Sequence, residues 1–307
     1  LFLESVWHAI EDAGYQPGDL SGTRTGVFAG VSSTDYHQLL LKQSDNVEPY
    51  QSTGMAHSVL TNRVSYLLNL KGPSRPFDTA CSSSLIALHE AVESIRRGEC
   101  DTALAGGVSL MFSPMVYLAF AKAGMLAPDG RCKAFDEAAD GYVRGEGVGV
   151  VLLKSLSAAR RDGDSIYAVV RGSSENHGGH TPSLTAPNPI AQAELIEQAW
   201  ARAGCRPEGL GLIEAHGTGT RLGDPIECNA LRRVHQSIGF DPDRPVALGS
   251  LKANVGHLEA AAGIASVIKA ALCLKYRKIV RQNHFSVQNP QIDFKGTPYF
   301  IPTETIN

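Results

Sequence analysis

Helical and strand-like patterns alternate along the whole chain, and this alternation limits the possible folds more than any other feature. Each change of period coincides with Gly, Pro, Asn or Asp, the residues that favour turns. Strands that alternate with helices form a mostly parallel sheet covered by helices, so the sequence predicts an α/β fold. In the first half we expect helices over residues 3–13, 55–68 and 82–97, and strands over 25–31, 102–109 and 147–153, with a further strand ending at Asp78.

The second half of the chain repeats this scheme. It predicts strands over residues 166–172, 210–215 and 246–249, and helices over 190–203, 225–234 and 258–275. No low-complexity linker separates the halves. The simplest architecture is one domain made of two related α/β halves, residues 1–160 and 161–307, which meet near residues 158–165.

Composition argues against several classes of partner. The formal net charge of −3 leaves no cationic surplus for nucleic-acid phosphates or an anionic membrane. Apolar residues occur in short runs, so no segment is expected to span a bilayer, and residues 1–10 show no signal-peptide pattern. The 6 cysteines lack C-x-x-C spacing, which fits neither a zinc site nor a disulfide framework. We therefore expect a cytoplasmic protein.

One cysteine is placed where a nucleophile would be useful. Cys81 lies between a short strand and an amphipathic helix, so it is expected at a helix N-terminus. Lowering a thiol pKa from about 8.5 to about 7 takes about 2 kcal/mol, and a helix N-terminus supplies roughly 0.3 to 2 kcal/mol. Cys81 is therefore a candidate nucleophile, although a small buried cysteine would give the same pattern.

Two histidines follow predicted strands in glycine-rich turns. His216 comes directly after the strand over residues 210–215, at the edge where α/β sheets usually bind ligands. Asp224 as N-cap, Pro225 at the first helical position and Glu227 three residues after the cap predict the next helix start, so both acids are expected to be structural. The glycines of this loop do not fit the G-x-G-x-x-G spacing of a nucleotide-binding loop.

His257 repeats this design in the segment 252–257 (KANVGH), after the strand over residues 246–249. We expect it at the start of the helix over 258–275, where the helix dipole favours neutral imidazole. Each histidine alone is also compatible with a structural loop residue. A metal site is not expected, because no third ligand has suitable spacing and His177 with His180 lies in a flexible glycine-rich loop.

Several segments resemble the signature sequences of polyketide β-ketoacyl synthases, over nearly the whole chain. They are residues 78–85 (DTACSSSL), 214–220 (EAHGTGT), 252–263 (KANVGHLEAAAG), 62–66 (NRVSY), 124–136 (GMLAPDGRCKAFD) and 140–147 (DGYVRGEG). The resemblance implies a thiolase fold, with two related halves in a five-layered α-β-α-β-α arrangement, and a homodimer.

The resemblance also implies roles for individual residues. Cys81 would accept the acyl chain from the phosphopantetheine arm of an acyl carrier protein, and His216 and His257 would promote decarboxylation of a malonyl-type extender on a second carrier protein. The enolate would then attack the Cys81 thioester. Lys252 would maintain the surroundings of His257. Thr218, Thr220 and Asn254 would bind the substrate arm, and no cofactor or metal would be bound.

A finer resemblance concerns residues 176–179 (NHGG) and 183–189 (SLTAPNP), which are similar to ketosynthases of bacterial trans-acyltransferase assembly lines. Relatives in this family carry roughly a hundred residues before a segment like residues 1–14, and a Gly-Phe-Gly-Gly-type loop after a segment like 299–307. We therefore expect this chain to be truncated at both ends and, by itself, poorly active.

Other functions remain open from the sequence. A non-elongating ketosynthase-like module would transfer acyl chains without condensing them, but such modules commonly lack the histidine found here as His216. Fatty-acid β-ketoacyl synthases share the chemistry, although the segments around Cys81 and His216 favour the polyketide group. Decarboxylating loading modules replace the cysteine and chalcone-synthase-like enzymes replace His257, while a cysteine protease would leave His257 unexplained.

Overall fold

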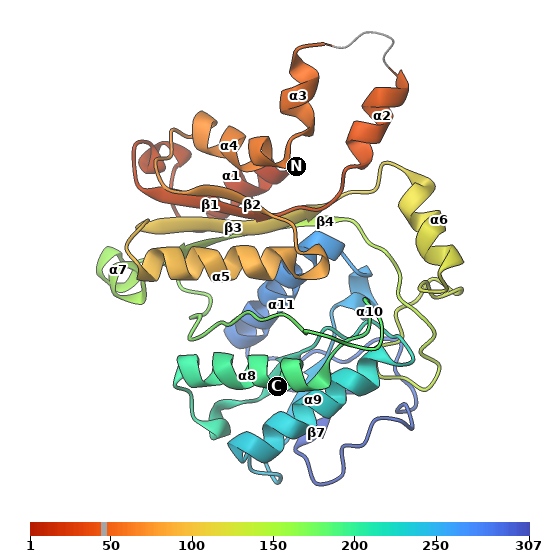
Figure 1. The fold of residues 1–307 in the computed structure, drawn as a ribbon. Helices are drawn as coiled ribbons and strands as arrows, with labels where there is room; N and C mark the ends of the chain where they lie inside the picture. The colour runs from red at the N-terminus through yellow and green to blue at the C-terminus, as the bar shows by residue number, and fades with distance from the viewer. Residues whose placement is uncertain (44–47) are drawn as a thin grey trace. The chain divides into compact units, whose positions relative to one another are not determined.

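The computed structural model of the chain describes residues 1–43 and 48–307 (Figure 1). Its contacts divide the chain into two compact units. Unit 1 comprises Leu1–Ala119, Gly145–Val169 and Leu258–Ile268, and unit 2 comprises Phe120–Arg144, Val170–His257 and Lys269–Asn307. The chain therefore passes from one unit to the other five times, and neither unit is a continuous stretch of sequence.

Unit 1 is built on a mixed sheet. Its strands lie in the order β2 (Ser74–Phe77), β1 (Thr25–Gly30), β3 (Thr102–Ser109) and β4 (Gly147–Lys154). The first three are parallel, and β4 runs antiparallel to β3. The almost fully buried β1 and β3 consist mainly of small and apolar residues, as expected for inner parallel strands. Pro76 lies in β2 at the edge, where the missing N–H disrupts no central ladder.

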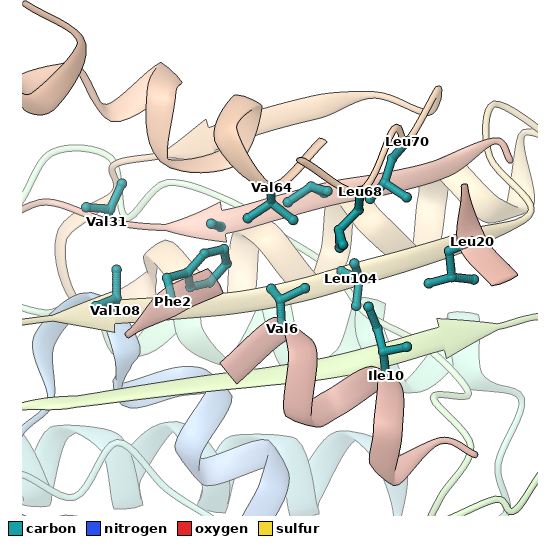
Figure 2. Close-up of a cluster of buried hydrophobic side chains, with 12 residues drawn as sticks. Phe2, Val6, Ile10, Leu20, Val31, Val64, Leu68, Leu70, Leu104 and Val108 are labelled. Carbon is teal, nitrogen blue, oxygen red and sulfur yellow. The ribbon is translucent and has the colours of Figure 1, made fainter. Parts of the chain in front are cut away.

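Helices cover both faces of this sheet (Figure 1). On one face, α1 (Phe2–Asp12) and α4 (His57–Leu67) bury Val6, Ile10 and Val64 against Leu104 of β3 (Figure 2). On the other, α5 (Ser83–Arg96) packs with Phe28. Because successive strand residues point to opposite faces, neighbouring residues of β1 belong to these two different cores.

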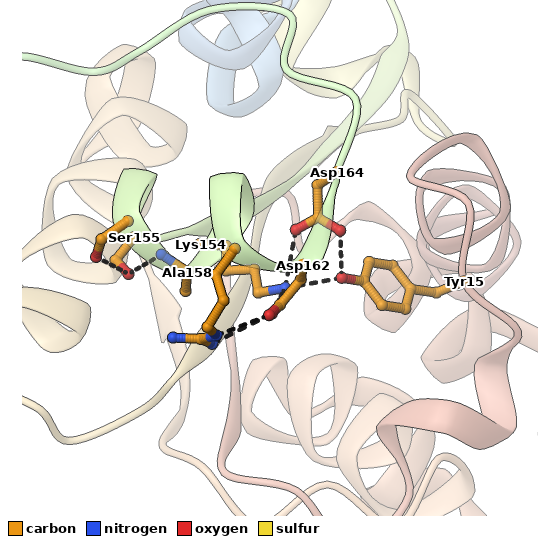
Figure 3. A network of polar contacts seen from close by, with 8 residues as sticks. Tyr15, Lys154, Ser155, Ala158, Asp162 and Asp164 are labelled. Carbon is orange, nitrogen blue, oxygen red and sulfur yellow. Dashed lines mark hydrogen bonds and ion pairs between the residues drawn. The ribbon is translucent and has the colours of Figure 1, made fainter.

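A polar network connects the C-terminal ends of β4, α7 (Leu156–Asp162) and α1 in unit 1 (Figure 3). Lys154, at the end of β4, contacts Asp162 at the end of α7, Asp164 and the hydroxyl of Tyr15, which follows α1. The Tyr15 hydroxyl donates to Asp164 at 2.5 Å. Burial lowers the pKa of Lys154, but its hydrogen bonds to the two aspartates and to Tyr15 outweigh that effect and raise it above the ordinary value.

Unit 2 contains a small parallel sheet in the order β5 (Leu212–Glu214), β6 (Val246–Gly249) and β7 (Tyr299–Phe300). The helices α8 (Pro189–Ala203) and α9 (Gly223–Ile238) pack against each other. The core of the unit includes Phe135, Leu231, Leu248 and Tyr299, all less than a tenth exposed.

The chain contains further short helices that the sequence patterns did not predict. They are α2 (Asp35–Gln43), α3 (Tyr50–Met55), α6 (Pro114–Lys122), α7, and α10 (Lys252–Val255), with single 3-10 turns at Pro17–Leu20, Ala80–Ser82, Pro207–Gly209 and Glu259–Ala261. Over the residues that the structure describes, no helix is long and apolar enough to cross a membrane.

Most of the predicted elements are confirmed. The strands over residues 102–109 and 246–249 have the predicted bounds, and the predicted helices other than the last two begin and end within two residues of the predicted limits. The strand predicted over 210–215 is shorter, because only Leu212–Glu214 pairs with β6. The helix predicted over 225–234 extends to Ile238.

Three predictions are wrong. Residues 166–172 form no strand: Ile166, Tyr167, Val169 and Val170 are each more than a third exposed, so β-branched composition without a paired neighbour does not make a strand. The last long helix, α11 (Ala262–Tyr276), begins four residues later than predicted. Asp224 is not an N-cap, because α9 begins at Gly223 and the Asp224 side chain turns into the protein instead.

Candidate active site

Cys81 lies in a tight turn of unit 1 between β2 and α5. It is the central residue of the 3-10 turn Ala80–Ser82, and its side chain is exposed. The preceding Ala80 has φ +54, a left-handed conformation that is unusual for a residue with a Cβ. As predicted, the cysteine therefore stands at the N-terminal end of a helix, separated from α5 by part of one turn.

Side-chain hydroxyls hold the backbone of this turn. Ser83 Oγ accepts the Thr79 N–H at 2.9 Å and donates to the Ala80 carbonyl at 2.6 Å. Ser82 Oγ donates to the Thr79 carbonyl at 2.9 Å. Asp78 accepts the Ala80 N–H at 3.2 Å. Residues within three or four positions of one another thus fix the conformation that presents Cys81.

Small residues let α5 lie close to the sheet behind this turn. A Cβ at Gly30 of β1 would lie 2.4 Å from the Ser84 nitrogen, and one at Gly107 of β3 would lie 2.7 Å from the Ser84 Cβ. Ser84 is fully buried, and its Oγ accepts the Ile264 N–H at 3.0 Å. The base of the Cys81 turn is therefore closely packed.

His216 and His257 lie together in unit 2. Their ring centroids are 5.4 Å apart with the planes at 85°. His216 follows β5, and His257 follows α10 after β6. Since β5 and β6 are adjacent and parallel, the loops that carry both histidines leave the same edge of the sheet. In the described part of the chain, neither ring joins a third His, Cys, Asp or Glu in a cluster that could hold a metal ion.

A buried lysine connects the two histidine loops. Lys252, on α10, is 5% exposed, and its Nζ donates to the His216 carbonyl at 2.5 Å. Such a charge opposes protonation of a neighbouring imidazole. Lys252 was predicted to maintain the surroundings of His257, and the structure adds this direct bond to the backbone of His216.

Both imidazoles are biased towards the neutral form. Burial, followed by Lys252, His216 and Arg144, lowers the pKa of His257 to about 2, and its side chain is 2% exposed. Burial and Lys252 also lower the pKa of His216, but that residue is exposed to solvent on one side, so water weakens the effect. The sequence predicted a neutral His257 because of the dipole of a helix that begins at residue 258. No helix begins there, and burial together with nearby cations favours the neutral form instead.

Two carboxylates, the buried Asp224 and the partly buried Glu227, shape the His216 loop. Glu227 accepts the N–H groups of His216 and Gly217 at 2.7 and 2.9 Å. Asp224 accepts those of Gly219 and Phe135 at 3.2 and 2.8 Å. Burial raises the pKa of Asp224 to about 6 and also raises that of Glu227. The sequence predicted structural roles for both acids but not that they bind the histidine loop. The sequence signal that could have indicated these bonds is the position of both acids in the first turns of the helix that directly follows the loop.

The residues predicted to bind substrate have different environments. Thr218 is 7% exposed, and its Oγ1 lies 3.2 Å from Thr220 Oγ1. Thr220 Oγ1 also accepts the Gly223 N–H. Asn254 is exposed on α10. Unit 2 thus contains both histidines, Lys252, the two threonines and Asn254, whereas Cys81 belongs to unit 1.

Known proteins are similar to this chain over almost its whole length. The family model for the β-ketoacyl synthase N-terminal domain matches residues 1–159, and that for the C-terminal domain matches residues 167–286. Polyketide synthase PksN of Bacillus subtilis is 50% identical over 310 residues. A phenolphthiocerol/phthiocerol polyketide synthase of Mycobacterium tuberculosis is 50% identical over 304 residues. Each match covers 99% of this chain, but only 6% and 20% of the respective relatives.

Solved structures give the same result for the fold. The ketosynthase from module 6 of the bacillaene synthase of Bacillus subtilis 168 has a TM-score of 0.92 at 40% identity. The oxazolomycin ketosynthase domain OzmH KS7 of Streptomyces albus JA3453 has a TM-score of 0.92 at 44% identity. These matches cover 99% of this chain and 52% and 53% of those chains. The predicted α/β thiolase fold is confirmed.

Proposed function

This chain belongs to the β-ketoacyl synthase family, and on that premise we propose that it catalyses decarboxylative Claisen condensation in polyketide synthesis. The observation that carries the proposal is the contact between two imidazoles, both biased to be neutral, beside a buried lysine. Neutral imidazoles donate hydrogen bonds without introducing a charge of their own. Such hydrogen-bond donors stabilise the negative charge that develops on a thioester oxygen.

The first half-reaction loads the acyl chain. The thiolate of Cys81 attacks the carbonyl carbon of an acyl thioester on the phosphopantetheine of an acyl carrier protein, and the pantetheine thiol leaves after protonation. The exposed Cys81 side chain and its position before α5 support this role. A thiolate is favoured at a helix N-terminus, although Cys81 lies in the short 3-10 turn that precedes α5 and not in the first turn of α5 itself, which limits this effect.

The second half-reaction forms the carbon-carbon bond. A malonyl-type thioester loses CO2, and the electron pair of the broken bond forms an enolate whose oxygen accepts hydrogen bonds from His216 and His257. The enolate carbon attacks the Cys81 thioester, and collapse of the tetrahedral adduct releases the Cys81 thiolate and a β-ketoacyl carrier protein. One preorganised donor to such an oxyanion contributes about 3 kcal/mol.

The other predicted residues support these steps in the proposal. Lys252 opposes protonation of both histidines and orients the His216 loop. Thr218, Thr220 and Asn254 bind the pantetheine arm. The proposal includes acyl carrier proteins as the macromolecular partners and a second copy of the chain as the partner in a homodimer. The thiol chemistry of Cys81 favours a reducing compartment, which supports a cytoplasmic location. The trans-acyltransferase subtype rests on the resemblance of residues 176–179 and 183–189 alone.

The test is an acylation and condensation assay on the full protein that contains this chain. Wild type, Cys81→Ala, His216→Ala and the control His180→Ala, an exposed histidine of unit 2, receive acylated carrier protein and then malonyl carrier protein. Intact-protein mass spectrometry follows the acyl group. We expect His216→Ala to acquire the acyl group at Cys81 but to lose condensation, while His180→Ala behaves like wild type.

Two results would overturn the proposal. A wild type that becomes acylated but never condenses would identify a non-elongating acyl-transfer module. Unchanged condensation by His216→Ala would remove the histidine from the mechanism.

A further inference from the structure

Residues 141–144, here called the strap, connect the two histidine loops of unit 2. Gly141 donates its N–H to the Gly219 carbonyl at 3.0 Å, in the loop of His216, and the Val143 carbonyl accepts the His257 N–H at 2.6 Å. Four consecutive residues therefore bond to both loops. The strap thus links the backbones of the two histidine loops through hydrogen bonds.

The strap is itself held on its other side. Tyr142 exchanges backbone hydrogen bonds with Met125 and Ala127, at 3.1 and 2.9 Å, and the Val143 N–H donates to Cys132 Sγ at 3.1 Å. A Cβ at Gly141 would lie 2.6 Å from the Ala127 nitrogen, so the backbones approach as closely as a glycine allows. The strap has little room to move independently of residues 125–132.

The side chain of Tyr142 contacts His257 directly. The two ring centroids are 5.3 Å apart, with an interplanar angle of 62°, which is an edge-to-face arrangement. Tyr142 is 7% exposed and His257 is 2% exposed. His216 lies against the same imidazole at 85°, so His257 has an aromatic neighbour in two directions.

A second layer supports Tyr142. The Phe120 ring packs edge-to-face against Tyr142 at 6.3 Å, and the Arg144 guanidinium lies over Phe120 at 5.4 Å from its centroid. Arg144 is 7% exposed, and its backbone forms an isolated parallel bridge with His257. These contacts form a continuous series of side chains, from His257 through Tyr142 and Phe120 to Arg144. The backbones of its two end residues, His257 and Arg144, pair with each other.

We propose that Tyr142 is a positioning residue for His257: held by the strap and by Phe120, its ring fixes the rotation of the imidazole from which the N–H is donated. The inference deepens the proposed function and rests on it for its kinetic consequence. A hydrogen-bond donor that rotates away from a developing oxyanion loses transition-state binding, whereas ground-state binding of the thioester arm depends on other residues.

The test compares Tyr142→Leu with Tyr142→Phe and with the matched control Phe240→Leu. Phe240 is 5% exposed and packs edge-to-face on Trp200 in the same unit, so its loss removes a similar aromatic contact elsewhere. In a malonyl-thioester decarboxylation assay on the full protein, we expect Tyr142→Leu to lower kcat by roughly 10- to 100-fold with KM nearly unchanged. We expect Tyr142→Phe to retain wild-type values within about 3-fold, because the ring and not the hydroxyl carries the contact.

A second measurement does not depend on the reaction. Proton and nitrogen NMR of the imidazoles, with His257 assigned through His257→Gln, reports the ring-current shift and tautomer of His257. We expect both to change in Tyr142→Leu and to stay close to wild type in Tyr142→Phe and Phe240→Leu. If Tyr142→Leu does not fold, Tyr142→Met fills the space without a ring and takes its place.

The outcomes separate the two proposals. Unchanged His257 signals in Tyr142→Leu, or equal kinetic losses in Phe240→Leu, would overturn the positioning role. A wild type without decarboxylation would instead contradict the proposed function, and the NMR comparison would still decide the role of Tyr142.

Discussion

The turn that carries Cys81 and the loops that carry the histidines are built from different kinds of contact. Around Cys81 the defining hydrogen bonds join residues at most four positions apart, such as Ser83 with Thr79 and Ala80. Around the histidines they join distant residues: Phe135 bonds to Asp224, and Lys252 bonds to His216. The Cys81 turn is exposed and held by local hydrogen bonds. The histidine region, in which His257 and Lys252 are buried while His216 is exposed, depends on the packing of unit 2.

This difference separates two requirements of the proposed chemistry. A nucleophile has to be reached by a carrier-protein arm, so exposure and a rigid turn suffice. Donors to an oxyanion have to be neutral and fixed, which is favoured by burial, as at His257, and by a neighbouring cation such as Lys252. Substitutions in the two regions should therefore have different effects, and the following predictions test that separation.

The largest effect is expected at Lys252. Lys252→Met removes the cation that opposes protonation of both histidines and the donor to the His216 carbonyl. We expect condensation to fall about 100-fold while Cys81 is still acylated at a rate close to wild type. Intact-protein mass spectrometry and CO2 release measure the two steps, with the exposed Lys295→Met as control. Equal losses in acylation and condensation would break the separation between the regions.

Glycine substitutions test whether the histidine loop is fixed by distant backbone. Gly219 and Gly239 have nearly the same φ, +75 and +76, but a Cβ at Gly219 would lie 2.8 Å from the Lys133 nitrogen, whereas one at Gly239 would meet nothing within 4 Å. We expect Gly219→Ala to lower the free energy of unfolding by about 3 kcal/mol and Gly239→Ala by about 1 kcal/mol. Urea unfolding gives both values. Similar midpoints and slopes for the two variants would show that packing adds nothing to the conformational cost.

The buried Asp224 should make stability depend on pH. Its folded-state pKa of about 6 lies above the ordinary value of about 4, so between these values the folded chain binds a proton that the unfolded chain does not. This group therefore makes the protein less stable as the pH rises from about 4 to 6. Relative to Asp224→Asn, wild type should lose about 2 kcal/mol over that interval, measured by urea unfolding at each pH. If the free energies of unfolding of wild type and Asp224→Asn change in parallel with pH, the Asp224 carboxyl has the same pKa in the folded and the unfolded state.

The smallest effect is expected in the Cys81 turn. Ala80→Gly relieves the strain of φ +54 but also gives the unfolded chain more freedom, so we expect the free energy of unfolding to change by less than about 1 kcal/mol. The rate of Cys81 alkylation by iodoacetamide should stay within about 2-fold of wild type. A larger change in reactivity would show that the turn depends on the side chain at residue 80 and not only on the path of its backbone.

The same division explains what the sequence could predict. The helix after Cys81, the bounds of β3 and β6, and the placement of both histidines after adjacent strands follow from local periodicity and turn residues. The strand expected over residues 166–172 was wrong because a strand needs a partner, which composition does not supply. The helix start predicted at Asp224 was wrong because its side chain accepts the Phe135 N–H instead of capping α9. The start predicted at His257 was wrong because its N–H bonds to Val143 and a 3-10 turn over Glu259–Ala261 precedes α11.

The parts of the candidate site that were missed depend on long-range contacts. Glu227 and Asp224 bind the His216 loop, and Tyr142 lies more than a hundred residues before the histidine that it contacts. The segment over residues 140–147 was noticed only because it resembles a family signature. Nothing in its own periodicity indicates that it connects two loops.

The interleaving of the two units also has a consequence for synthesis on the ribosome. Unit 1 is complete only when Leu258–Ile268 is available, because that segment supplies the N–H that Ser84 accepts and packs against Gly107. At about 5 to 20 residues per second, roughly 10 to 30 s pass between the emergence of β3 and that of this segment. During that interval part of the packing around the helix that begins beside Cys81 is not yet available. Unit 1, although its first residues are translated first, therefore cannot finish folding until residues 170–257 of unit 2 have also been translated.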